Sequence, residues 1–185
     1  MLVLATIVPN DAFVPWDYVR SIFALPPKYE FLTLQGCSLS NNRNGIWQII
    51  KKRESDLLFI DSDMVFTPED VAKIEQNLTK YDIVGGLYQL MNGWPAILDR
   101  TNDDYMFISA KNGIFEVGAC GTGFMGISRR VIEKLGDEPF NSVIEGNVTH
   151  GDDVSFCHRA REAGFKVFVD SDIRLGHIKS QIIKP

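Results

Sequence analysis

Strands alternate with helices along the first half of the chain, and this order limits the fold more than any other feature. Short apolar runs predict strands at residues 2–8, 29–35, 57–60 and 82–88. The intervening segments predict amphipathic helices at about 15–24, from Ser40 or Asn41 onward, and at 68–79. A βαβαβαβ order indicates parallel strands joined by right-handed crossovers.

The second half of the chain has a less regular pattern. Strand-like runs separated by turn residues predict a small antiparallel excursion at 95–98, 105–109 and 114–117. Further strands are expected at 123–127, 166–169 and 173–177, and helices at 129–135 and 153–163. No repeat or linker interrupts the sequence. We therefore expect one α/β domain over residues 1–185, with a mostly parallel central sheet flanked by helices.

The apolar run Leu57–Ile60 leads directly into Asp61-Ser62-Asp63. Open α/β sheets bind ligands just beyond the carboxyl ends of such buried strands. Two carboxylates at that place can hold a hard divalent cation, which can in turn hold phosphates. Asp and Ser also favour helix caps and turns. However, the next helix has its own start signal in Thr67-Pro68, so the two aspartates are not needed for capping.

Composition excludes several classes of partner. A net charge of −5 and the lack of a basic stripe argue against binding to nucleic acid. No stretch reaches the length of a transmembrane helix, so no integral membrane segment is expected. The three cysteines, Cys37, Cys120 and Cys157, fit neither a disulfide framework nor a zinc site. This pattern favours a reducing, cytoplasmic location. The sequence does not indicate an oligomeric state.

Three weaker features carry potential chemistry. Asp152 and Asp153 open the predicted helix at 153–163, where acids also complement the helix dipole. His177 lies in the last predicted strand, where a lone histidine is often only hydrogen-bonded. The glycines around Thr122, including Gly123, permit close approach of a ligand but are equally typical of a strand entry. Each feature alone leaves both interpretations open.

The order of these features over almost the whole chain resembles that of the GT-A glycosyltransferases, especially family 2. The family's Asp-x-Asp motif matches Asp61-Ser62-Asp63, and its acidic pair matches Asp152-Asp153, with Asp152 in place of Glu. Further matches are the first strand and loop that cradle the nucleobase (Thr6–Asp11), the Ala-Arg-Asn element (Asn42-Arg43-Asn44, with Asn42 in place of Ala) and the terminal histidine (His177). The resemblance implies a single GT-A-like domain.

The resemblance also implies metal-dependent transfer of a sugar from a UDP- or GDP-sugar to a hydroxyl acceptor, with inversion expected. In this interpretation Asp63 and His177 ligate Mn²⁺ or Mg²⁺, and the mixed oxygen and nitrogen set favours Mn²⁺. Asp61 binds the metal through water or holds the sugars of the donor. Asp153 is the catalytic base.

The remaining implied roles concern substrate binding. Asp152 orients the acceptor, and Arg43 and Asn44 contact the nucleotide. Ser62, Thr122 and Gly123 lie against the donor.

Two alternatives stay open. Haloacid-dehalogenase-type phosphatases also have Asp-x-Asp after an apolar strand, with Asp61 as nucleophile and Asp63 as acid/base. Two predicted βα units precede Asp61, whereas that motif usually lies on the first strand. The other alternative is a non-catalytic relative that binds nucleotide sugars.

Overall fold

The computed structural model describes residues 1–8, 13–101 and 104–179. Its helices are α1 (Trp16–Phe23), α2 (Leu39–Lys51), α3 (Pro68–Asn77), α4 (Arg129–Lys134) and α5 (Asp152–Glu162). The strands of the central sheet are β1 (Leu2–Val8), β2 (Glu30–Gln35), β3 (Asp56–Ile60), β5 (Ile83–Leu87), β8 (Ile114–Val117), β10 (Phe124–Ile127) and β13 (Val167–Arg174). The other strands are β4 (Met64–Val65), β6 (Ile97–Thr101), β7 (Asp104–Phe107), β9 (Ala119–Cys120), β11 (Ile144–Glu145), β12 (Val148–Thr149) and β14 (Gly176–His177).

The central sheet has seven strands in the order β2-β1-β3-β10-β5-β13-β8. Parallel pairs join β1 to β2, β1 to β3 and β5 to β13, whereas β10 and β8 run antiparallel to their neighbours. The predicted mostly parallel α/β sheet is therefore confirmed. The sequence alone did not indicate that β10 separates β3 from β5. Every residue of β10 is buried, as the centre of a sheet covered on both faces requires.

Only part of the predicted antiparallel excursion lies outside the central sheet. A three-stranded sheet forms in the order β7-β6-β9, and a separate hairpin joins β11 to β12. The expected third strand of the excursion, β8, instead pairs with β13 at the edge of the main sheet. Its apolar residues Phe115 and Val117 are buried, so β8 gains more by extending the core than by joining the small sheet.

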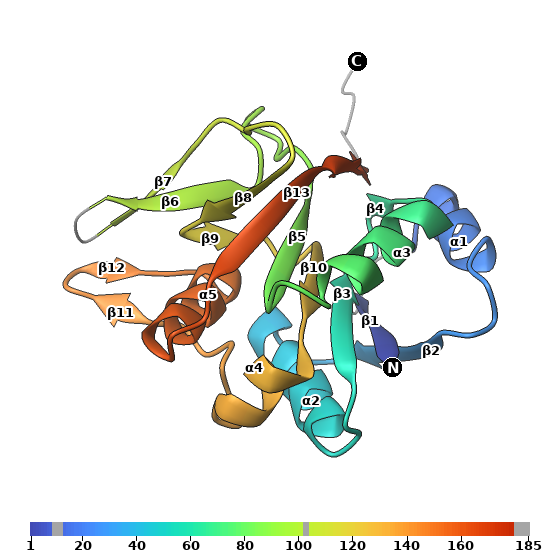
Figure 1. Ribbon diagram of the computed structural model, residues 1–185, viewed down its shortest axis with the longest axis horizontal. Helices are drawn as coiled ribbons and strands as arrows, with labels where there is room; N and C mark the ends of the chain where they lie inside the picture. Colours follow the sequence, from blue (N-terminus) through green and yellow to red (C-terminus); the bar gives the residue numbers. More distant parts are fainter. Residues whose placement is uncertain (9–12, 102–103, 180–185) are drawn as a thin grey trace.

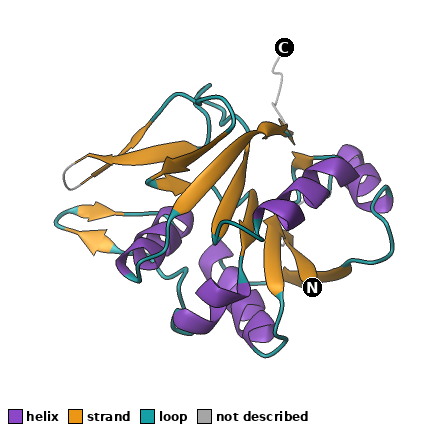
Figure 2. Cartoon of the chain, in the orientation of Figure 1, coloured by secondary structure: helices purple, strands orange, loops and turns teal. Residues whose placement is uncertain are grey.

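Helices cover both faces of the sheet (Figures 1 and 2). One apolar cluster includes side chains of α2, α4 and α5, and the other includes side chains of α1 and α3. The sequence predicts an apolar face of α1 formed by Trp16, Val19, Ile22 and Phe23, and this prediction was partly wrong. Trp16 and Phe23 are exposed, and α1 instead buries Tyr18 and Ser21. The hydroxyl of Tyr18 lies 2.6 Å from that of Thr6, so a polar contact fixes this face of the helix.

Three local features explain where elements begin and end. The N-cap of α2 is Ser38, not the predicted Ser40 or Asn41, and its hydroxyl accepts a hydrogen bond from the backbone of Asn41. Thr67 and Asp70 form a reciprocal capping box on α3, as expected from the start signal. The two final strands predicted at 166–169 and 173–177 are mainly one strand, β13, with an irregularity after Asp170.

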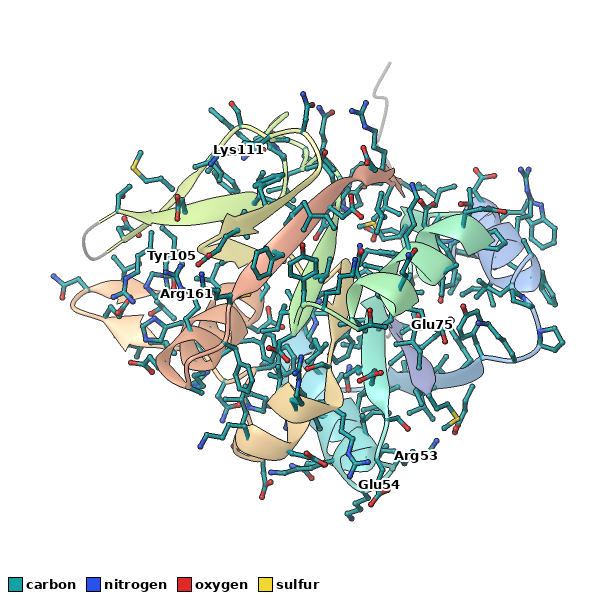
Figure 3. The ribbon with its side chains drawn as sticks, viewed as in Figure 1. Arg53, Glu54, Glu75, Tyr105, Lys111 and Arg161 are labelled. Carbon is teal, nitrogen blue, oxygen red and sulfur yellow. The ribbon has the colours of Figure 1, made fainter. Side chains whose placement is uncertain are left out.

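The amino end of β3 lies far from the strand ends that carry the Asp-x-Asp motif. Arg53 and Glu54 form the turn between α2 and β3, at the bottom of the view in Figure 3. Glu54 has a φ of 51°, an uncommon conformation for a residue other than glycine.

Of the helices described, none is long and apolar enough to cross a bilayer.

Candidate functional site

A cavity of about 540 Å³ opens at the carboxyl ends of β1 and β3. Four aspartates line it, namely Asp61, Asp63, Asp152 and Asp153. The other lining residues are Ile7, Phe13, Pro15, Leu39, Arg43, Ser62, Tyr88, Leu90, Thr122, His177, Ile178 and Lys179. The fold therefore brings Asp61 and Asp63 next to Asp152, Asp153 and His177, which lie about 90 to 116 residues further along the sequence.

Arg43 connects the two acidic motifs. Its guanidinium donates to Asp61 Oδ1 over 3.1 Å and also to Asp152 Oδ2, while its own side chain is only 4% exposed. Burial lowers the pKa of Arg43, but the attraction of Asp61, Asp152 and Asp153 outweighs burial and raises it. The Nε of Arg43 is buried and has no hydrogen-bond partner among the described residues. Arg43 is therefore a permanently charged, buried cation close to the carboxylates of Asp61, Asp152 and Asp153.

The position of Arg43 follows from the packing of α2. One turn further along the same face, Trp47 is fully buried, and its indole nitrogen donates to the carbonyl of Gly136 over 2.9 Å. Trp47 packs edge-on against Phe140 and Phe156, with ring centroids 5.9 and 5.7 Å away. Because Phe156 belongs to α5, this aromatic cluster holds α2 and the acidic start of α5 together.

Asp153 is the carboxylate of the cavity that no cation neutralises directly. Among the described residues, none of the Lys, Arg or His side chains forms an ion pair with it. Burial raises the pKa of Asp153. The backbone N–H of Val154 and the charge of Arg43 oppose this shift, whereas the charges of Asp152 and Asp61 add to it. A carboxyl group with a raised pKa binds a proton more readily, which is the property required of a general base.

His177 faces Asp63 across the cavity. Its Nδ1 lies 2.7 Å from the carbonyl oxygen of Gln89, which can only accept, so Nδ1 donates to it. Its Nε2 lies 3.2 Å from Asp63 Oδ2. Lys179 Nζ lies 2.7 Å from the same oxygen of Asp63.

The Asp63 and His177 pair fits a divalent cation. An imidazole whose second nitrogen donates to a carbonyl is oriented as metal-bound histidines are. Backbone pairing of β14 with β4 sets this geometry, because His177 pairs with Met64 directly after Asp63. Asp61, however, is paired with Arg43. Within the described parts of the chain, no three His, Cys, Asp or Glu side chains are grouped to share a metal ion.

The glycine-rich turn before β10 contributes one residue to the cavity. Thr122 is buried and lines the cavity wall, whereas Gly123 lies behind it against Tyr88. The hydroxyl of Tyr88 accepts a hydrogen bond from the backbone of Gly123 over 3.2 Å. A Cβ on Gly123 would come within 2.8 Å of that hydroxyl. Gly123 therefore makes room for Tyr88.

Two other predicted substrate-binding residues differ in position. Ser62 lines the cavity and is mostly buried. Asn44 is buried away from the cavity, where its amide donates to Asn141 Oδ1 over 2.8 Å and accepts from the backbone of Phe140 over 3.0 Å. Asn44 thus anchors the segment that leads into the β11–β12 hairpin.

The predicted nucleobase loop, Thr6–Asp11, is described only in part, because residues 9–12 lie outside the described residues. Thr6 donates to the carbonyl of Ile60 over 2.8 Å and so links β1 to the end of β3. Ile7, Phe13, Pro15 and Leu39 form an apolar end of the cavity beside this loop.

Two polar residues of the site, Tyr88 and Lys179, and several of its apolar residues were not predicted from the sequence. Tyr88 directly follows β5, a position that could have identified it because its strand ends at the same edge of the sheet. Lys179 follows His177 by two residues, and no motif distinguishes it from an ordinary surface lysine.

Comparison with known proteins supports the fold. No family model matches the chain, and no curated protein matches its sequence. A197 from STIV has a similar structure, with a TM-score of 0.74 and 22% identity over 97% of this chain and 87% of that chain. GalNAc-T7, crystallised with UDP, GalNAc and Mn²⁺, has a TM-score of 0.67 and 13% identity. That match covers 96% of this chain but only 44% of GalNAc-T7. The chain thus has a GT-A-like α/β fold.

Proposed function

We propose that this protein is a glycosyltransferase that uses a nucleotide-diphosphate sugar. The observation that carries the proposal is the single cavity in which Arg43 joins Asp61 to Asp152, with Asp63, Asp153 and His177 on its walls. Support comes from GalNAc-T7, a structure of the same fold that holds UDP, GalNAc and Mn²⁺. The family 2 type, the UDP or GDP base and the inverting outcome are parts of the proposal.

We infer that Asp63 and His177 hold the cation, with Asp61 contributing through water or binding the sugars of the donor. The carboxylate oxygen and imidazole nitrogen suit Mn²⁺ better than Mg²⁺. When bound, such a cation stabilises the negative charge that develops on the leaving diphosphate. Lys179 contacts the same oxygen of Asp63, so its ammonium group would add positive charge on the side of the site where the diphosphate would leave.

The chain's own residues supply the remaining steps. The acceptor oxygen attacks the anomeric carbon and its proton passes to Asp153, while the bond between that carbon and the diphosphate oxygen breaks and leaves its electron pair on the diphosphate. Arg43 keeps Asp152 and Asp61 in place during this step. The apolar end formed by Ile7, Phe13 and Leu39 is suited to the nucleobase.

The phosphatase alternative receives less support from the geometry. It requires Asp61 as a free nucleophile, but Asp61 Oδ1 is bound by Arg43. The binding-only alternative differs from the proposal in turnover alone, so an experiment must separate them.

The test has two steps. A panel of nucleotide sugars is first screened with Mn²⁺ for thermal stabilisation of the protein, which identifies the donor. Hydrolysis and transfer of that donor are then measured over an acceptor panel for the wild type, Asp153→Asn and Asp137→Asn. Asp137 is an exposed aspartate that pairs with Lys51 and serves as the matched control.

We expect Asp153→Asn to abolish turnover and retain donor binding, while Asp137→Asn behaves as the wild type. Donor binding without hydrolysis or transfer in the wild type would contradict the proposed activity and favour a binding-only protein. Full turnover in Asp153→Asn would remove Asp153 from the role of base.

A further inference from the structure

A second cavity adjoins the first at the strand ends. Its volume is about 750 Å³, within the range of small-molecule sites. Its lining comes from the end of β5 and the following turn, from Pro95, from Ser109 and Ala110 after β7, and from the last residue of β13 through β14 to Lys179. The two cavities share Tyr88, Leu90, His177 and Lys179. The two cavities are therefore adjacent at these four residues.

The two cavities have opposite charge. The first is lined by four aspartates. The second is lined by Arg174 and by Lys179, which is paired with Asp63 of the first cavity, and its described lining contains no Asp or Glu. A concave surface lined by positively charged side chains concentrates anionic ligands. The acidic cavity suits a cation with its diphosphate, whereas the basic cavity suits an anionic group directly.

An irregularity in β13 places Arg174 on this lining. β13 pairs with β5 in regular register up to Asp170 and Gly86, but the next pair joins Arg174 to Leu87. Residues 171–173 therefore form a bulge, a device that redirects side chains next to functional sites. The side chain of Asp170 accepts a hydrogen bond from the backbone of Asp172 over 3.0 Å, which stabilises the bulge.

The charge of Arg174 remains available. Its Nε donates to the carbonyl oxygen of Ser171 over 3.1 Å, which orients the guanidinium without neutralising it. No carboxylate of the described chain forms an ion pair with Arg174. A guanidinium fixed at Nε presents its two terminal nitrogens as a fork, which matches two oxygens of a phosphate or carboxylate.

We propose that the second cavity binds an anionic group of the acceptor, a phosphate or a carboxylate, and that Arg174 recognises it. This inference rests on the proposed function, because it assigns the cavity to the acceptor. A hydroxyl of the same acceptor extends past Tyr88 and His177 into the first cavity. The acceptor is then an anionic sugar or sugar derivative.

Calorimetric titrations test this inference on the full chain. The probes are glucose 6-phosphate for the phosphate class, glucuronate for the carboxylate class and glucose as the neutral reference, all in the presence of a chelator. The variants are Arg174→Gln and, as a control for net charge, Arg53→Gln. Arg53 lies at the opposite end of the molecule and pairs with Glu30 (Figure 3).

We expect at least one anionic probe to bind more tightly than glucose, and Arg174→Gln to weaken that binding about tenfold. Arg53→Gln should bind as the wild type. The probe that binds identifies the anionic class. Equal binding of glucose and both anions, or equal effects of the two variants, would overturn the inference.

A separate titration of UDP and of GDP with Mn²⁺ distinguishes this inference from the proposed function. We expect the affinity of the nucleotide that binds to be unchanged in Arg174→Gln and reduced in His177→Gln. If that nucleotide displaces the anionic probe and Arg174→Gln weakens both to the same degree, Arg174 belongs to the diphosphate site and the acceptor assignment is wrong. Failure of both nucleotides to bind to the wild type would instead contradict the proposed function.

Discussion

Arg43 is the residue on which the geometry of the candidate site depends most. It is one of three consecutive buried polar residues of α2, and its guanidinium lies between a strand-end carboxylate and a helix-start carboxylate. The cost of burying these charges is offset only while all of them are present. Removing one partner leaves the others desolvated and unpaired.

Arg43→Met is therefore expected to destabilise the protein by about 3–5 kcal/mol, as measured by urea denaturation at neutral pH. Arg43→Lys retains the charge but cannot contact both carboxylates in the same way, so we expect an intermediate loss. A loss for Arg43→Met within about 0.5 kcal/mol, as is usual for surface substitutions, would show that the ion pairs do not hold the site together.

Asp153 is expected to reduce stability at neutral pH. Because burial raises its pKa, the folded protein binds this proton more tightly than the unfolded chain does. Protonation of Asp153 therefore stabilises the folded protein. This stabilisation is lost as the pH rises from 3.8, the ordinary pKa of the group, through the raised pKa of Asp153 in the folded protein. Asp153→Asn should thus unfold at a higher urea concentration than the wild type at neutral pH, and the difference should shrink towards pH 3.8.

Asp152→Asn is the matched comparison for this prediction. Asp152 accepts the guanidinium of Arg43, so its neutralisation should lower stability at neutral pH. The two neighbouring substitutions are expected to have opposite signs. Destabilisation by Asp153→Asn at neutral pH would contradict the raised pKa.

At the scale of elements, the turn before β10 is built around Tyr88. Gly121 and Gly123 both face its hydroxyl, and a Cβ at Gly123 would also come within 2.7 Å of Met64. These atoms belong to a packed core that cannot give way freely.

Gly123→Ala is expected to cost about 1–3 kcal/mol of stability because of this overpacking, as measured by urea denaturation. Gly136→Ala is the control, since a Cβ there meets no described atom within 4 Å. Equal stability of the two variants would show that the turn has room for a side chain.

Element positions were predictable from the sequence wherever periodicity and local signals agreed. The strand that ends at Ile60 and the capped helix α3 are examples. The sequence did not predict the exposed face of α1, because the contact between Tyr18 and Thr6 joins residues of different elements. It also did not predict the central place of β10, since an apolar strand of four residues has the same pattern in any position of a sheet.

At the scale of the whole molecule, the two apolar clusters lie on opposite faces of one seven-stranded sheet. Strands β1, β3 and β5 contribute side chains to both clusters. If the helices on one face of the sheet came away, the apolar side chains of that face would be exposed to water. The strands that also carry the other cluster would then be destabilised. The single domain over residues 1–185 stays a prediction, which the unfolding of the protein can test.

Unfolding is accordingly expected to be one cooperative transition. Trp47 is fully buried against one face, whereas Trp16 and Trp94 are already exposed, so the change in tryptophan fluorescence reports mainly on that cluster. Far-ultraviolet circular dichroism reports on all helices. The two signals should give the same urea midpoint. Two separated midpoints would show that the faces unfold independently and that the chain contains more than one folding unit.

The candidate site was predictable to the extent that sheet topology brings strand ends together. Asp61, Asp63, Asp153 and His177 all line one cavity, whereas the roles that the resemblance implies for them stay predictions. Asn44 does not, because its amide anchors a neighbouring loop. Such a role depends on a partner far along the chain, and no local pattern encodes it.

The central claim is that Asp63 and His177 hold a cation that binds the diphosphate of the donor. Its most direct test is a calorimetric titration of UDP and GDP into the wild type and His177→Gln, with Mn²⁺ and with a chelator. We expect one nucleotide to bind only with Mn²⁺, and His177→Gln to weaken that binding about 10- to 100-fold. Equal nucleotide affinity in the presence of chelator, or unchanged affinity in His177→Gln, would contradict the claim.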